Sequence, residues 1–450
     1  MSFTRRTFVR SAAAMGMALP ALTPVPVRAA SPNGKMNHAA IGVGGKGWSD
    51  LLAFASSGRV HVAAICDVDL TRRRQAEQKF PGARRYQDWR ELLAKEGDRI
   101  DSVNVTTPDH MHAAITMTAL KAGKHVYCQK PLTHDIYEAR QVAAAAVKAG
   151  VTTQMGTQLA SGNGNLMSVA LIENGAIGKV KRAYLWSNKN IGNYRPHGPR
   201  SAKTDAVPDH VNWDHWLGTA PVRPYVRGVY HPTWWRGWQD FGCGWLGDMG
   251  CHIMDMPYRS LKLSMPLSIK ATVEDEWKNN AARRKETFPR WQIVDYIYPG
   301  TERTVGDTIQ LTWLDGYKYP PDEVRKYMGG EKFPQQAALL IGEAGSLLLP
   351  HGRMPRLFPV EKFKDYSYPK LRLRNHYHDW VKACFDGETT RSNFAYAGPM
   401  TEMVLAGTIA LRFPDQTLQW DAAGMSYTNV AEANNYVRRT YRAGWEVEGL

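Results

Sequence analysis

Three glycines near the start of the chain have the spacing of a loop that binds a dinucleotide. Gly42, Gly44 and Gly47 follow a short apolar run, Gly45 lies between them, and a segment of helical composition comes next. Glycines let the backbone turn tightly and approach a pyrophosphate, which the N–H groups at a helix N-terminus attract. The pattern predicts a dinucleotide site, with a purely structural glycine turn as the alternative.

The acidic residue Asp67 bears on which dinucleotide binds. It lies about 20 residues past Gly47, at the end of the second apolar run. A carboxylate there accepts the ribose hydroxyls and repels a 2′-phosphate, which favours NAD over NADP. Arg72, Arg73 and Arg74 follow closely and would suit a 2′-phosphate, so NADP stays as the less favoured cofactor.

A second group of residues combines carboxylate and imidazole chemistry. Asp248 and His252 are four residues apart, so on a helix they share one face. Such a pair can orient a substrate hydroxyl and remove its proton during hydride transfer. Asp255 is expected to support His252. The structural alternative is a capping aspartate and a packed core histidine.

Cysteines near this pair raise the question of a metal ion. Cys243 and Cys251 lie close in sequence to Asp248, His252 and Asp255. The segment has no tight Cys-x-x-Cys or His-x-x-x-His pair, and hydride transfer needs no metal. No metal site is predicted.

Strands and helices that alternate over residues 35–155 must hold the glycine loop. The apolar runs predict strands at 36–41, 60–66, 100–105, 125–128 and 151–155, and helices at 48–56, 110–122 and 137–149. Alternation of this kind is typical of βαβ units and a parallel sheet. The sequence therefore predicts an NAD-binding Rossmann domain over 35–155, in a protein of the α/β class.

Beyond residue 156 the chain changes character. Strand-like runs at 180–186, 267–273, 308–313, 338–341 and 346–349 are separated by loops rich in Pro and Gly, and helices are expected at 376–385 and 401–411. Seven tryptophans fall between Trp186 and Trp245, and most are expected in a core. We predict a C-terminal α/β domain over 156–450 with a large, open, mostly antiparallel sheet.

Three further motifs identify a family. They are Thr107-Pro108-Asp109-His110-Met111-His112, the run from Ala122 to Pro131 (AGKHVYCQKP), and the run from Gly247 to Asp255 (GDMGCHIMD). Together they resemble the Gfo/Idh/MocA oxidoreductases, the family of glucose–fructose oxidoreductase and inositol dehydrogenase. The resemblance covers nearly the whole chain after its first thirty residues. It implies a Rossmann domain and an open-faced sheet domain used for substrate binding and homo-oligomerisation.

The resemblance also assigns the central residues. Lys130 matches the lysine that lies beside the nicotinamide and the reacting carbinol, where a partly desolvated lysine can relay a proton. Asp248 and His252 match the substrate-binding acid and the catalytic histidine. Gln129 replaces the usual glutamate; it can still bind a ribose, but it removes a negative charge from beside Lys130.

The remaining candidates divide between cofactor and substrate. Aromatic faces stack on sugar C–H surfaces, and Arg and His side chains bind hydroxyls. We expect cofactor contacts from Thr107, Pro108, His110 and Gln158, and substrate contacts from His134, His231, Trp235 and Arg236. His112 is expected to be structural.

The composition excludes several classes of protein. The 450 residues are 43% hydrophobic and 22% charged, which rules out a disordered chain. The 5 cysteines are too few and scattered for a disulfide scaffold. The net charge of +15 suggests nucleic acid, but it is spread along the chain rather than gathered in a binding module, so no nucleic-acid partner is predicted.

Part of this positive charge belongs to an export signal. Arg5 and Arg6 precede a short, small-residue apolar run, and Val27-Arg28-Ala29 resembles a cleavage site. Residues 1–30 therefore read as a twin-arginine signal peptide. We expect the twin-arginine export machinery as a partner and a periplasmic or otherwise exported location.

These observations favour an exported NAD-dependent oxidoreductase that acts on a sugar, sugar derivative or cyclitol at a ring carbinol. Free NAD is scarce outside the cytosol, so the cofactor should be tightly held and recycled. Two net reactions satisfy this: paired oxidation and reduction of two sugars, or glycoside hydrolysis by oxidation, elimination, hydration and reduction, as in NAD-dependent α-N-acetylgalactosaminidases. A non-catalytic sugar-binding protein is the remote alternative.

Overall fold

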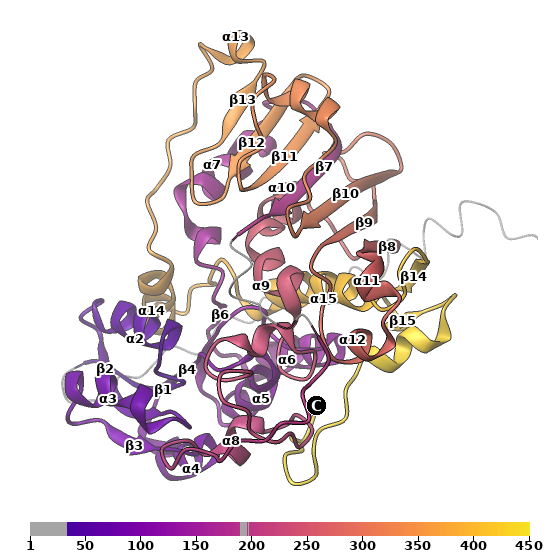
Figure 1. Ribbon diagram of the computed structural model, residues 1–450. Helices are drawn as coiled ribbons and strands as arrows, with labels where there is room; N and C mark the ends of the chain where they lie inside the picture. Colours follow the sequence, from indigo (N-terminus) through magenta and orange to yellow (C-terminus); the bar gives the residue numbers. More distant parts are fainter. Residues whose placement is uncertain (1–33, 190–195, 197) are drawn as a thin grey trace, which may run out of the picture.

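The computed structural model describes residues 34–189, 196 and 198–450, so the expected signal at 1–30 lies outside the described residues. Its first sheet has six strands in the order β3-β2-β1-β4-β5-β6, all parallel (Figure 1). The strands are β1 (Met36–Ile41), β2 (Val60–Cys66), β3 (Arg84–Tyr86), β4 (Ser102–Val105), β5 (His125–Cys128) and β6 (Thr153–Met155). The order reverses between β1 and β4, where a Rossmann sheet opens a crevice for its ligand.

The helices of this half are α2 (Lys46–Ala55), α3 (Leu70–Lys79), α4 (Trp89–Glu96), α5 (His112–Lys121) and α6 (Ile136–Ala149). A 3-10 turn, η2 (Asp109–Met111), precedes α5, so the helix predicted from residue 110 begins two residues later. The sequence pattern missed α4, and it also missed α3 and β3. The reason is their polarity: α3 buries only Ala76, and β3 consists of two exposed arginines and Tyr86.

The second sheet has nine strands in the order β13-β12-β11-β7-β10-β9-β8-β14-β15. Its strands are β7 (Val180–Ser187), β8 (Ser268–Val273), β9 (Gln292–Pro299), β10 (Thr308–Asp315), β11 (Gln336–Gly342), β12 (Ser346–Pro350), β13 (Arg356–Phe358), β14 (Thr417–Asp421) and β15 (Ser426–Tyr427). Neighbours are antiparallel except β7 and β10. The predicted mostly antiparallel sheet is confirmed, and the unpredicted β9 is one of its central strands.

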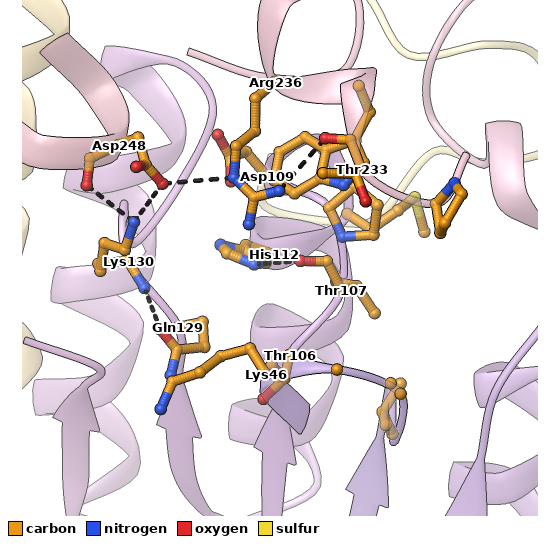
Figure 2. Close-up of a pocket in the computed structure, with 18 of the residues that line it drawn as sticks. Lys46, Thr106, Thr107, Asp109, His112, Gln129, Lys130, Thr233, Arg236 and Asp248 are labelled. Carbon is orange, nitrogen blue, oxygen red and sulfur yellow. Dashed lines mark hydrogen bonds and ion pairs between the residues drawn. The ribbon is translucent and has the colours of Figure 1, made fainter. Parts of the chain in front are cut away.

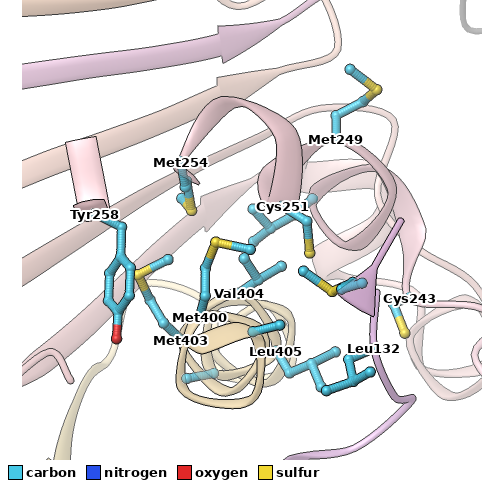
Figure 3. Close-up of a cluster of buried hydrophobic side chains, with 14 of the residues drawn as sticks. Leu132, Cys243, Met249, Cys251, Met254, Tyr258, Met400, Met403, Val404 and Leu405 are labelled. Carbon is cyan, nitrogen blue, oxygen red and sulfur yellow. The ribbon is translucent and has the colours of Figure 1, made fainter. Parts of the chain in front are cut away.

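The buried helix α15 (Phe394–Ala410) joins the two halves. It is apolar on nearly every side, as a helix surrounded by other elements must be. Figure 3 shows Met400, Met403 and Val404 of α15 beside α9 (Gly244–Ile253). A Cβ on Gly407 would lie 1.8 Å from the Tyr296 hydroxyl oxygen, so glycine allows β9 to approach. This packing fixes α9, which carries Asp248 and His252.

Other helices and turns connect these elements. They are α7 (Asn163–Glu173), α8 (Trp213–Leu217), α10 (Asp255–Ser260), α11 (Asp275–Lys278), α12 (Ala281–Glu286), α13 (Val360–Phe363) and α14 (His376–Asp386), with η1 (Gly97–Arg99), η3 (Gln158–Ser161), η5 (Trp234–Gly237), η6 (Asp322–Met328) and η7 (Ala431–Tyr436). Trp213, Trp216, Trp235 and Trp238 pack in one buried cluster. Among the residues that the structure describes, no helix is long and apolar enough to cross a membrane.

The chain returns to the first half after it has built the second sheet. Trp380, Val381 and Cys384 of α14 share a buried cluster with Phe54 and Tyr127 of the Rossmann half. The predicted division at residue 156 is therefore too simple, because α14 is far along the chain but packs against α2. The sequence alone shows only that α14 is helical and apolar on one side.

Candidate active site

A cavity of about 520 Å³ lies between the Rossmann loops and the second half. At one end it is lined by residues at the carboxyl ends of β1, β2 and β4, where a Rossmann fold binds its ligand. At the other end it reaches α9 and the end of β12. The predicted residues that line it are Gly42, Gly44, Gly45, Asp67, Thr107, Pro108, Gln129, Lys130, Gln158, His231, Trp235, Arg236, Asp248 and His252.

The glycine loop has the backbone shape that a bound phosphate requires. Gly42 has a φ of +80°, and a Cβ there would lie 2.3 Å from the carbonyl oxygen of Thr106. A Cβ on Gly47 would lie 1.9 Å from the Gly42 carbonyl oxygen, so Gly47 packs behind the loop and not on the cavity wall. No side chain caps the start of α2 at Gly45, which lines the cavity, and the first turn of α2 contains no acidic residue.

Asp67 and Arg72 complete this end of the cavity. The Asp67 carboxylate accepts hydrogen bonds from the backbone N–H groups of Val43 (3.0 Å) and Gly44 (3.2 Å). Burial raises the pKa of Asp67. Arg72 lies against the loop, since a Cβ on Gly44 would be 2.5 Å from its Nε. Loop, carboxylate and guanidinium fit the pyrophosphate and ribose of NAD.

Lys130 and Asp248 form the centre of the opposite end. The Nζ of Lys130 donates to Oδ1 (2.6 Å) and to the backbone oxygen (2.7 Å) of Asp248, and Nε of Arg236 lies 3.3 Å from the same Oδ1 (Figure 2). Burial alone would raise the pKa of Asp248, but the charges of Lys130 and Arg236 outweigh it and lower the pKa far below its usual value. Asp248 is therefore ionised between two cations.

His252 lies one helical turn beyond Asp248 on α9. Burial lowers its pKa well below the usual value, and the charge of Lys130 adds to the effect, so the ring is neutral. None of the described residues hydrogen-bonds to its buried Nδ1, and its ring centre is 5.8 Å from that of His351. His252 lines the cavity, where a neutral imidazole can accept a hydrogen bond or a proton from a ligand.

Asp255 does not support His252, contrary to expectation. The helix breaks between the two residues, and Asp255 begins α10. Its carboxylate accepts hydrogen bonds from Tyr396 (2.8 Å) and Asn165 (3.2 Å) and pairs with Arg259 (3.2 Å). Its role is to fix α10 to neighbouring helices.

A carboxylate that the sequence interpretation missed lies beside Gln129. Nε2 of Gln129 donates to Oδ2 of Asp50 (2.8 Å), and Asp50 also accepts from the Tyr377 hydroxyl (2.7 Å) and pairs with Lys46 (2.7 Å). The backbone N–H of Lys130 donates to Oε1 of Gln129 (3.3 Å). The negative charge absent at Gln129 is thus present on α2, where no local motif marks it.

Asp109 is a second carboxyl group that the sequence interpretation did not assign. It lines the cavity and accepts a hydrogen bond from the Cys243 N–H (3.1 Å). Burial raises its pKa to about 7, although Arg236 and Lys130 oppose the shift. The only sequence signal was its place in the Thr107–His112 motif.

Three predicted histidines lie elsewhere than expected. His110 does not line the cavity, because η2 turns its ring to the carbonyl oxygens of Trp216 (3.0 Å) and Phe241 (3.3 Å). His134 lines a separate cavity beside Arg412 and Arg439. His231 does line the main cavity, but its Nε2 lies 2.8 Å from Asp69, at the cofactor end.

His112 has the structural position predicted for it, although it also lines the cavity. Its ring nitrogens face the carbonyl oxygens of Pro131 (2.7 Å) and Thr107 (2.9 Å), so it ties two loops together. The wall contributed by the second half contains residues that no motif indicated: Lys189, Gln336 and His351. Within the described part of the chain, no group of three or more His, Cys, Asp or Glu side chains is placed to hold a metal ion.

The fold and this cavity define an oxidoreductase-type protein with an NAD-binding domain. Comparison with protein families agrees: residues 36–157 match the oxidoreductase family with an NAD-binding Rossmann fold, and residues 173–305 match its C-terminal alpha/beta domain. The chain belongs to the Gfo/Idh/MocA oxidoreductase family, as its motifs predicted.

Three relatives show how far the similarity to known proteins extends. An α-N-acetylgalactosaminidase of Shewanella oneidensis is 28% identical over 207 residues, which are 42% of this chain and 43% of the relative. The chain thus matches less than half the length of this relative. Among solved structures, an aldose-aldose oxidoreductase from Caulobacter crescentus complexed with glycerol has a TM-score of 0.57 at 16% identity, over 86% of this chain and 100% of that one. The WlbA dehydrogenase from Bordetella pertussis, in complex with NADH and UDP-GlcNAcA, has a TM-score of 0.59 at 15% identity, over 86% and 99%.

Proposed function

We propose that the protein is an NAD-dependent enzyme that oxidises a ring carbinol of a carbohydrate and retains its cofactor between turnovers. The observation that carries this proposal is the contact of Lys130 with Asp248, in the same cavity as the glycine loop. When bound, NAD supplies the hydride acceptor. The protein supplies the groups that bind the hydroxyl and move its proton.

Each of these groups has a distinct part. Lys130 holds or moves the hydroxyl proton at Nζ, and Asp248 keeps that nitrogen in place through two hydrogen bonds. Arg236 lines the cavity and stacks on Trp235, with its Cζ 4.1 Å from the ring centre. The neutral imidazole of His252 is the proton acceptor. Positioned groups of this kind typically accelerate proton transfer by about 10²–10⁴-fold.

Net hydrolysis of a glycoside is a second candidate, favoured by the similarity to the Shewanella α-N-acetylgalactosaminidase. Oxidation of a carbinol acidifies the adjacent C–H bond, and loss of that proton expels the glycosidic oxygen. Water then adds to the double bond, and reduction restores the carbinol, so no net oxidation occurs. This sequence needs groups that accept and donate protons, and the neutral imidazole of His252 and the ammonium of Lys130 supply them.

One experiment separates these reactions. The purified full chain is examined for bound dinucleotide by absorbance, then mixed with sugars and aryl glycosides. Reduced nicotinamide that persists until a second sugar arrives supports paired oxidoreduction, whereas aryl alcohol release without net reduction supports hydrolysis. A protein that releases no dinucleotide on unfolding and turns over no carbohydrate would contradict both proposals.

An enzyme that is exported with NAD already bound must retain that cofactor, because free NAD is scarce outside the cytosol. We propose that residues 1–30 direct the chain through the twin-arginine pathway, on the basis of Arg5 and Arg6. Changing both to lysine should leave the protein in the cytoplasm, as cell fractionation would show.

We also propose a homo-oligomer formed through the second sheet, which light scattering would test.

A further inference from the structure

A second cavity of about 380 Å³ adjoins the first. His252 and His351 line both cavities, so the two spaces meet at these rings. The second cavity continues between the start of α7 and the turn after β12. The reacting end of the first cavity therefore borders the second cavity.

The walls of the second cavity combine an apolar floor with a polar rim. Leu349, Ala338 and Ile253 are buried and form apolar surface. Asn163 and Arg353 are exposed at the rim and carry hydrogen-bond donors. A sugar ring has the matching character, since its C–H face is apolar and its edge carries hydroxyls. The cavity volume is within the range of about 300–1,000 Å³ typical of small-molecule sites.

The elements that form the walls of the second cavity are packed closely against one another and against neighbouring helices. A Cβ on Gly164 would lie 1.9 Å from the carbonyl oxygen of Arg353, so α7 and the turn after β12 are in direct backbone contact. Asn165, also in the lining, donates to Asp255 (3.2 Å), which Tyr396 and Arg259 hold in turn. The wall formed by α7 is thus tied to α10 and α15.

We propose that this second cavity is a subsite for a second sugar unit, covalently joined to the sugar that reacts beside Lys130. The substrate class is then a disaccharide or the end of an oligosaccharide, with the linkage passing over the rings of His252 and His351, which border both cavities. The inference rests on the proposed function, because it places the reacting sugar at Lys130. The first cavity must hold the nicotinamide end of the cofactor as well, which leaves the second as the space for the rest of the substrate.

The test compares chain length with subsite variants. Arg353→Ala removes a rim donor, and Met354→Trp fills the mouth with a larger side chain at a position that is 48% exposed. The matched control is Arg356→Ala, whose arginine pairs with Glu331 outside the cavity. Thermal unfolding of all three shows whether each remains folded.

For the wild type and each variant, kcat/KM is to be measured with aryl monosaccharides and with disaccharides that have the same reacting unit. Disaccharide affinity is to be measured by calorimetry. The wild type and Arg356→Ala should favour disaccharides about tenfold or more, which corresponds to at least about 1.4 kcal/mol. Arg353→Ala and Met354→Trp should reduce that preference and the affinity while monosaccharide turnover stays unchanged.

The possible outcomes distinguish failure of the proposed subsite from failure of the proposed function. Monosaccharide turnover without any preference for disaccharides would overturn the subsite and leave the proposed function standing. An equal gain from an unlinked second sugar would overturn the covalent linkage. Disaccharide preference unaffected by both subsite variants would place the second unit elsewhere. Absence of all carbohydrate turnover, with the chain folded and NAD bound, would contradict the proposed function itself.

Discussion

The Nζ of Lys130 lies 2.6 Å from Oδ1 of Asp248, and this contact joins the two halves of the protein. Lys130 follows β5 of the Rossmann sheet, whereas Asp248 belongs to α9, which packs against α15. Both side chains are largely buried. The acid–base group of the site therefore exists only when both halves are folded against each other.

Replacement of Lys130 by methionine should remove proton transfer while the cofactor loop stays intact. We expect kcat to fall by roughly 10²–10⁴-fold, the usual contribution of a positioned acid or base. Dinucleotide released from the purified variant should match that of the wild type. Lys148→Met, at an exposed position on α6, is the control and should retain activity. Full activity of Lys130→Met would refute the assignment.

The pH dependence of the reaction should report Asp109. Its pKa is raised to about 7, so it passes from neutral to ionised across the physiological range. The ionised form carries a negative charge in the same cavity as His252, so it favours the imidazolium that forms when His252 takes up the substrate proton, and carbinol oxidation should rise with pH through about 7. Asp109→Asn should abolish this step in the kcat profile. The same step in the variant would assign the titration to another group.

The buried carboxylate of Asp50 should matter for stability. Its side chain is fully buried, forms an ion pair with Lys46 and accepts hydrogen bonds from Gln129 and Tyr377. Asp50→Asn removes the charge and leaves at least one donor without its partner, which typically costs about 1–3 kcal/mol. We expect a lower Tm by calorimetry. Asp98→Asn, at an exposed position, should leave Tm unchanged; an equal effect of the two substitutions would argue against the network.

The glycine loop can be tested without touching the catalytic residues. Gly42→Ala places a Cβ 2.3 Å from the Thr106 oxygen at a φ of +80°, a conformation that costs alanine about 1–3 kcal/mol. NAD binding, followed by calorimetry, should weaken at least tenfold because the loop must move. Gly82→Ala is the matched control, since nothing lies within 4 Å of its Cβ. Wild-type affinity in Gly42→Ala would show that the loop does not hold the cofactor.

Several parts of the fold were predictable because they are locally encoded. The apolar strands β1, β2 and β5 and the glycines between them identify the Rossmann half, since buried parallel strands are continuous apolar runs. Polar elements such as α3 and β3 were not found, because they bury little and carry no periodicity. The return of α14 to the first half was equally invisible, because packing partners far apart in sequence leave no local pattern.

The residues of the candidate site also divide into those that the sequence predicted and those that it did not. Sequence motifs and spacing pointed to Lys130, Asp248, His252 and the glycine loop, and these residues line one cavity in the structure. Asp50, Asp109 and His351 had no assigned part, and His110 and His134 were placed in a site that they do not line. A motif specifies which residue types are present, but the backbone turn at each residue decides where a side chain points.

The sequence by itself determined the class of fold, the family and the preference for NAD over NADP, because glycine spacing, strand alternation and an acidic residue after β2 are local properties. Only the tertiary structure decided which charges meet. Burial and proximity pair Asp248 with Lys130 and Arg236, raise the pKa of Asp109 to about 7, and place His252 between two cavities. These effects depend on distances across the fold, which no linear pattern records.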